Sequence, residues 1–99
     1  MILSHYDVLV ALNPSPVVEL NRAVAIAMAD GPERGLALFV PLEGELDGYH
    51  LFHAARADLF RRLERNEDAA AAYRRALELV TNPQQRSYLE RRLAEVTGS

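Results

Sequence analysis

We expect an all-α fold from three features of the sequence. Alanine and leucine each occur fifteen times among the 99 residues, against seven aromatic residues and no tryptophan, and this balance favours helix over sheet. Proline and glycine divide the chain into segments of helical length, none of which requires a strand. With 49% hydrophobic and 25% charged residues, the composition fits one small folded domain.

The first half of the chain contains clear helix boundaries. Asn13-Pro14-Ser15-Pro16 ends a first segment and opens a second, with Ser15 as a candidate N-cap and proline at the first helical position. Gly31 suits a left-handed helix end, and Pro32 followed by an acid suits the next helix start. We expect residues 43–48, which are polar and contain two glycines, to form a loop.

The second half is divided in the same way. Asn66 can cap a helix that runs through an alanine block, and Asn82-Pro83 starts the last helix. Short connections of this kind favour antiparallel neighbours. The expected helices, about six in all, are 2–12, 16–30, 32–42, 49–64, 66–80 and 83–96.

The sequence repeats itself with a period of 34 residues. In most pairs a small residue falls on a small one and a large residue on a large one, as expected for helix hairpins whose backbones approach closely and which stack on one another. The superposed pairs are Arg22 and Arg56, Ala23 and Ala57, Ile26 and Phe60, Ala29 and Leu63, Gly35 and Ala69, Phe39 and Tyr73, and Leu42 and Ala76.

This period and pattern resemble the tetratricopeptide repeat, most specifically over residues 57–79. The resemblance implies antiparallel helix hairpins stacked as a right-handed solenoid. A single domain over residues 1–99 would then comprise four parts: the second helix of an incomplete repeat (1–14), one repeat (15–48), a second repeat (49–82) and a capping helix (83–99). Because the first part lacks a partner helix, we expect the chain to be a fragment of a longer one.

At finer grain the chain resembles the C-terminal tetratricopeptide-like extension of certain bacterial extracytoplasmic-function RNA polymerase sigma factors. The resemblance spans nearly all 99 residues. In that family two further helical domains bind core polymerase and read the promoter, and the resemblance implies that this extension regulates them. Neither of those two domains is present in the 99 residues. The resemblance rests on the runs Tyr6-Asp7-Val8-Leu9, Pro14-Ser15-Pro16-Val17-Val18-Glu19-Leu20-Asn21-Arg22-Ala23-Val24-Ala25, Gly31-Pro32, Gly35-Leu36-Ala37, Tyr49-His50-Leu51-Phe52-His53-Ala54-Ala55-Arg56-Ala57-Asp58-Leu59 and Tyr88-Leu89-Glu90-Arg91-Arg92-Leu93.

The repeat resemblance also implies that the first helix of each hairpin lines a concave groove. The residues that would face it are apolar in one repeat and largely charged in the other. We expect the apolar half to be covered by earlier parts of the full-length protein or by a partner helix, or alternatively to pack against the helix at residues 2–12. The candidate groove residues are Val17, Leu20, Val24, Ala27 and Met28, then Leu51, Ala54, Asp58, Arg61 and Arg62.

Several polar residues of these runs have both a structural and a functional interpretation. Asp58 with Arg61 and Arg62 is either a local surface pair or a contact for an acidic partner. His50 and His53 lie three apart, close enough for two metal ligands, but no further motif completes a set and we expect no metal. Five polar residues belong to the runs that resemble the sigma-factor extension: Asn21, Arg22, His50, His53 and Arg56. We expect each of the two arginines to reach solvent or to pair with a carboxylate such as Glu19 or Asp58.

The composition excludes several classes of function. There is no cysteine for disulfides or thiolate zinc sites, and a net charge of −3 lacks the excess of basic groups that direct nucleic-acid binding requires. No serine, histidine and acid have catalytic spacing, and no phosphate-binding loop follows a strand. We therefore expect a non-enzyme without cofactors, located in the cytoplasm and independent of membranes.

The leading hypothesis is a regulatory protein-interaction domain of a sigma factor. Its partners would be the promoter-reading domains of the same protein or core RNA polymerase, as the resemblance implies. The alternatives are a stand-alone scaffold that binds an unrelated protein, and a homodimer formed through an exposed apolar face.

Overall fold

The computed structural model describes residues 15–98, and all the regular secondary structure within that range is helical. The all-α prediction is therefore confirmed for this part of the chain. The helix expected over residues 2–12 lies outside the described residues. The elements are α2 (Pro16–Asp30), α3 (Pro32–Phe39), the 3-10 turn η1 (Val40–Leu42), α4 (Glu43–Leu46), α5 (His50–Arg62), α6 (Asn66–Leu79) and α7 (Pro83–Thr97).

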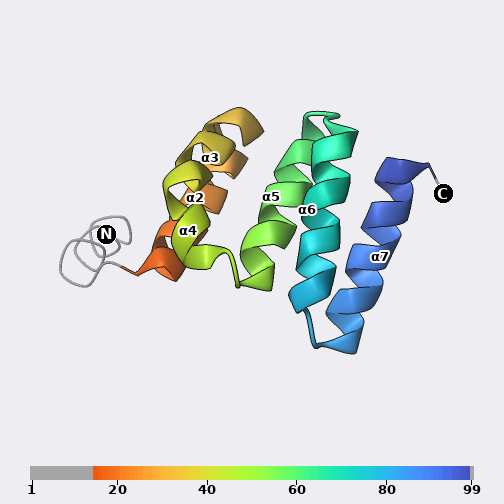
Figure 1. Ribbon diagram of the computed structural model, residues 1–99. Coiled ribbons are helices and arrows are strands. Elements are labelled where there is room, and N and C mark those ends of the chain that lie inside the picture. Colours follow the sequence, from red (N-terminus) through yellow and green to blue (C-terminus); the bar gives the residue numbers. More distant parts are fainter. Residues whose placement is uncertain (1–14, 99) are drawn as a thin grey trace.

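Each helix packs mainly against helices close to it in the sequence. The α2 helix contacts α3, α5 contacts α6, and α7 contacts α6, while α3 also contacts α5. Figure 1 shows these helices following one another across the molecule from α2 to α7, joined by short connections. The result is two helix hairpins in contact, with one further helix beside the second hairpin.

Four of the seven pairs related by 34 residues are buried in both hairpins, whereas Arg22 and Ala29 are exposed. The small residues Ala23, Ala57 and Ala69 are at most 2% exposed, and Gly35 is buried as well. The aromatic pair Phe39 and Tyr73 is also buried, in α3 and α6 respectively. The repeat in the sequence therefore matches a repeat in the packing, because each hairpin places small residues and one large ring at equivalent positions.

The buried side chains form two clusters that share a boundary residue. The first cluster joins α2, α3, η1 and α4 to one side of α5, and the second joins the other side of α5 to α6 and α7. Leu36 of α3 packs against both clusters. The α5 helix thus belongs to both clusters, and its position relative to α2 and α7 is fixed by packing on two sides.

The loop expected over residues 43–48 is partly helical. Glu43–Leu46 forms α4, directly after η1. Leu42 and Leu46, four residues apart, are both buried in the first cluster. Burial of this apolar pair favours a helical turn over the loop that the glycines and acidic residues indicated.

The helix ends differ in how they are capped. Asn82 accepts hydrogen bonds from the backbone N–H groups of Gln84 and Gln85, at 2.8 and 3.0 Å. Ser15 precedes α2 but its side chain makes no capping hydrogen bond. Asn66 is the first residue of α6 rather than its cap. Gly31 has a positive φ of 108°, but with a ψ of 156° it lies outside the left-handed helical region that was expected; glycine adopts this conformation without a steric cost.

We expect Asn82→Ala to destabilise the chain by about 1 kcal/mol, because it removes the acceptor for two N–H groups at the start of α7. Ser15→Ala is the matched control, since Ser15 occupies the same position before α2 without a side-chain hydrogen bond. Urea unfolding followed by circular dichroism measures both changes. Equal effects of the two substitutions would contradict the capping role of Asn82.

Candidate partner-binding groove

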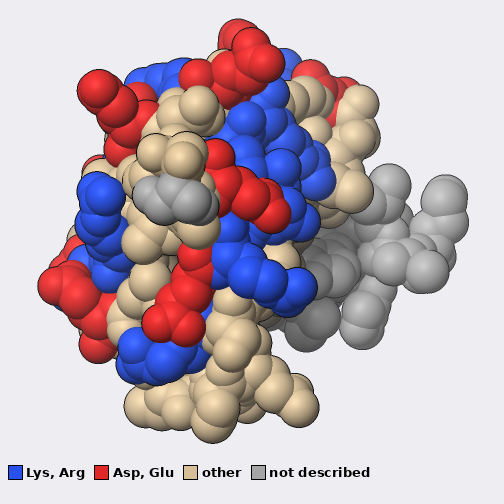
Figure 2. Space-filling view, turned by 90° about the vertical axis from the view of Figure 1, so that its right-hand side faces the viewer, with Lys and Arg blue, Asp and Glu red and all other residues tan. Residues whose placement is uncertain are grey.

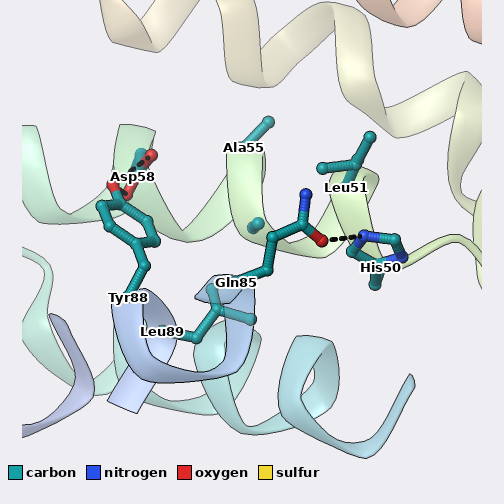
Figure 3. Close-up of a pocket in the computed structure, with 8 residues that line it drawn as sticks. His50, Leu51, Ala55, Asp58, Gln85, Tyr88 and Leu89 are labelled. Carbon is teal, nitrogen blue, oxygen red and sulfur yellow. Dashed lines mark hydrogen bonds between the residues drawn. The ribbon is translucent and has the colours of Figure 1, made fainter. Parts of the chain in front are cut away.

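A pocket of about 300 Å³ lies between α5 and α7. Its apolar surface comes from Leu51, Ala54 and Ala55 of α5 and from Leu89 of α7. Its polar groups come from His50 and Asp58 on one helix and from Gln85 and Tyr88 on the other. Figure 3 shows the two sets of side chains facing one another across the pocket.

Asp58 is the centre of a hydrogen-bond network that joins three helices. The Tyr73 hydroxyl of α6 donates to Asp58 Oδ1, and the Tyr88 hydroxyl of α7 lies 3.4 Å from Oδ1 and 3.3 Å from Oδ2. Arg61 adds an ion pair at 3.9 Å to Oδ1 and donates from Nε to the Tyr73 hydroxyl at 3.3 Å. The carboxylate is thus oriented by groups from α5, α6 and α7.

Tyr73 is the buried member of this network. Its ring is 0% exposed, and burial, together with donation to Asp58, raises the pKa of its phenol well above the ordinary value. The effect of Arg61 is opposite and smaller. Tyr73 therefore remains a neutral hydrogen-bond donor, as a donor to a carboxylate must be.

The two histidines have different structural roles. His50 Nε2 donates to Gln85 Oε1 at 2.7 Å and so connects α5 to α7 at the end of the pocket. His53 is buried, and its Nε2 donates to the backbone carbonyl of Asp47 at 2.6 Å. Within residues 15–98, no three His, Cys, Asp or Glu side chains are grouped to hold a metal ion. The third histidine, at position 5, lies outside the described residues.

The arginines at equivalent repeat positions are Arg22 and Arg56. The Arg56 guanidinium lies 3.5 Å from Glu43 Oε1 and over the Phe60 ring, 5.4 Å from its centroid. Arg56 thus pairs with a carboxylate as expected, but with Glu43 rather than Asp58. Glu43 lies beside α5 because residues 43–46 form the helix α4, whereas a loop was expected there. Arg22 and the neighbouring Asn21 are exposed on α2.

The apolar half of the predicted groove is partly exposed and partly core. Val17 and Met28 are 38% and 67% exposed, and Val24 is half-buried. Leu20 and Ala27, in contrast, are buried in the first cluster. The prediction that these two line an open groove is wrong, because they pack against α3, η1 and α5.

The charged half of the groove lies beside the pocket. Leu51 is 41% exposed and lines it together with Asp58. Arg62 is exposed and its Nη1 lies 3.3 Å from the sulfur of Met28, the residue one repeat earlier. That contact brings the ends of α2 and α5 together, so the exposed groove residues of the two repeats are neighbours.

Sequence reasoning missed the second wall of the pocket. Extending the 34-residue shift once more places Leu51, Ala54 and Asp58 on Gln85, Tyr88 and Arg92, all of them in α7. Two of these three α7 residues line the pocket. The signal is therefore present in the sequence, although the tetratricopeptide resemblance predicts a capping helix for residues 83–99 and not a further groove-lining helix.

The outer end of the molecule, at α7, carries mixed charge. Figure 2 shows this end with arginine side chains gathered next to acidic ones. One such pair is Arg92 with Glu95, at 2.9 Å, and Arg92 also lies over the Tyr88 ring at 5.3 Å. Exposed pairs of this kind contribute little stability, but they divide the surface into small regions of either sign.

One comparison with known proteins finds a relative. The chain is 43% identical over 88 residues to an uncharacterized protein of Rhizobium meliloti (strain 1021). The match covers 89% of this chain but 21% of the relative, so the chain spans about a fifth of that protein. No family model and no solved structure matches the chain.

None of the helices within residues 15–98 is both long enough and apolar enough to cross a bilayer.

Proposed function

We propose that this chain is a non-catalytic protein-interaction domain that regulates a bacterial extracytoplasmic-function sigma factor in the cytoplasm. The observation that carries the proposal is the agreement between the 34-residue repeat and the buried positions of two successive hairpins. An array of such hairpins offers its open face to other proteins. In this proposal the hairpins form a right-handed tetratricopeptide-like solenoid.

The open face fits a protein partner better than a nucleic acid. It combines the exposed side chains of Met28 and Leu51 with the Asp58 carboxylate and with Arg62, which contacts Met28. Apolar side chains beside a small number of placed charges are typical of peptide-binding grooves. Nucleic-acid binding requires a continuous basic surface, whereas the α7 end has alternating charges (Figure 2).

The proposal places the domain within a longer protein. Its partners would be the promoter-reading domains of that protein or core RNA polymerase, and its role would be to set the level of promoter-dependent transcription. The length of the Rhizobium meliloti relative, about five times that of the match, is consistent with a domain of this kind. The gene sequence upstream of Met1 is the first observation to make.

We expect Arg62→Glu, in the whole protein that contains the chain, to weaken regulation of promoter output about three- to tenfold. Arg62 is exposed at the junction of α2 and α5, so the reversed charge alters the groove without disturbing the core. Transcript yield with bacterial core RNA polymerase is the measurement. Arg34→Glu, a reversal at an exposed arginine of α3, is the control and is expected to leave regulation unchanged. Regulation that is equal in Arg62→Glu and wild type would contradict the proposal.

A homodimer is the second candidate, favoured by the exposure of Val17, Met28 and Leu51 on α2 and α5. Apolar side chains exposed together are common at interfaces between copies of a chain. A stand-alone scaffold that binds an unrelated protein is a further alternative, and it would use the same exposed side chains. Sedimentation velocity distinguishes the candidates, since a monomer at high micromolar concentration would leave the homodimer without support.

A further inference from the structure

The pocket between α5 and α7 combines an apolar floor with a single carboxylate. Leu51, Ala54 and Leu89 contribute aliphatic surface, and Tyr88 contributes a ring beside Asp58. Among the eight lining residues, Asp58 is the only acidic one, and none is a lysine or arginine. The chemical character of the pocket is therefore that of an alkyl-binding site that ends in a negative charge.

Asp58 has acceptor capacity left for a ligand. A carboxylate offers about four lone-pair positions, and the hydrogen bond from Tyr73 uses one of them, on Oδ1. The Tyr88 hydroxyl lies 3.3 Å from Oδ2, beyond the usual range of about 2.5–3.0 Å for such bonds. The side chain is 30% exposed and lines the pocket. Oδ2 can thus accept a further, stronger donor without loss of the bond from Tyr73.

We infer that this pocket receives a basic side chain of the partner protein, with arginine as the best fit. The aliphatic stem of an arginine would lie along Leu51, Ala54 and Leu89, as such stems do on apolar surfaces. Its guanidinium would donate to Asp58 Oδ2 and stack on the Tyr88 ring. The volume of about 300 Å³ leaves room for one long side chain.

The nearby arginines of the chain are already engaged. Arg61 pairs with Asp58 Oδ1 and donates to Tyr73, and Arg92 is held by Glu95 at 2.9 Å. Arg61 thus shares the charge of the Asp58 carboxylate from the side of Oδ1, and Oδ2 keeps lone pairs that an incoming cation can use. This inference rests on the proposed function only in taking the partner to be a protein.

The test uses two small probes of equal shape and different charge. We would titrate the 99-residue chain, labelled with ¹⁵N, with n-butylguanidinium and with neutral n-butylurea at constant ionic strength. Amide signals of Leu51, Ala54, Asp58 and Tyr88 are expected to shift with n-butylguanidinium. We expect n-butylurea to bind about tenfold more weakly at the same residues, because it lacks the charge that pairs with the carboxylate.

Variants then test the role of the carboxylate itself. Asp58→Asn is expected to weaken n-butylguanidinium binding about tenfold, whereas Asp68→Asn, at an exposed acid of α6 that pairs with Arg65, leaves it unchanged. Should Asp58→Asn not fold, Leu51→Ser removes exposed apolar surface instead and is expected to weaken binding about threefold.

Three results would overturn the inference: equal binding of the two probes, equal binding by wild type and the Asp58 or Leu51 variant that folds, or stronger binding of n-butyrate at the same residues. Each of these outcomes leaves the transcription test with Arg62→Glu intact. If Arg62→Glu weakens regulation as expected but n-butylguanidinium does not bind, the groove binds a protein whose contacting side chain is not basic.

Discussion

Gly35→Leu is expected to destabilise the chain by about 3 kcal/mol, the largest single effect that the structure predicts. Gly35 lies where α3 crosses α2. A Cβ atom added there would collide with the Cβ of Ala27 and would lie 3.2 Å from both Ala27 Cα and Leu59 Cδ1. Since one of these atoms is backbone, rotation of a side chain does not relieve the clash, and α3 must move away from α2 and α5.

Gly44→Leu is the matched control for this substitution. Gly44 lies in α4, and a Cβ added there meets nothing within 4 Å. Because leucine favours helix over glycine, we expect no loss, or a gain of about 0.5–1 kcal/mol. The free energy of unfolding in urea measures both changes. Equal stability of Gly35→Leu and wild type would mean that the two helices do not approach at this position.

The crossing of α2 and α3 at Gly35 is an example of packing that the sequence predicts. The 34-residue shift pairs Gly35 with Ala69 and Ala23 with Ala57, and all four are buried. Small residues at helix crossings and large residues beside them leave a periodic trace in the sequence, because close backbone approach excludes larger side chains. For this reason the repeat predicts the small buried residues at the crossings and the rings beside them, whereas the bounds of the long helices follow from the prolines, glycines and caps between them.

The exceptions depend on contacts between segments that have no such period. Glu43–Leu46 forms a helix because Leu46 packs into the first cluster. Leu20 is buried because α3, η1 and α5 cover the side of α2 on which it lies. The hydroxyl of Tyr73 was also missed as a functional group. The repeat predicts a large ring at this position, but the partner of its polar end depends on which residue of α5 lies opposite.

The local environment of Tyr73 predicts a decline in stability at alkaline pH. Because the folded state raises the pKa of this phenol above its ordinary value of 10.0, the folded chain keeps the proton at pH values where the unfolded chain has lost it. The stability is therefore complete below pH 10 and decreases as the pH rises towards the folded pKa. The slope that Tyr73 contributes approaches about 1.4 kcal/mol per pH unit.

Tyr73→Phe isolates this contribution. At pH 8 we expect it to destabilise the chain by about 2 kcal/mol, because it removes a buried hydrogen bond to the Asp58 carboxylate while the ring still fills the core. Between pH 10 and 11 the difference from wild type is expected to shrink, since the wild type alone loses the stability linked to this phenol. Urea unfolding at a series of pH values between 8 and 11 measures both effects.

Tyr49→Phe is the control, because it removes a hydroxyl outside the Asp58 network and keeps Tyr73. It is expected to retain the alkaline decline of the wild type. If the stabilities of wild type and Tyr73→Phe instead ran parallel from pH 8 to 11, Tyr73 would not be the buried proton donor described above. The Asp58 carboxylate would then lack the hydrogen bond from Tyr73 that orients it, with Oδ1 towards α6 and Oδ2 available to a partner. The same measurement therefore also tests the proposed binding of a cation at Asp58.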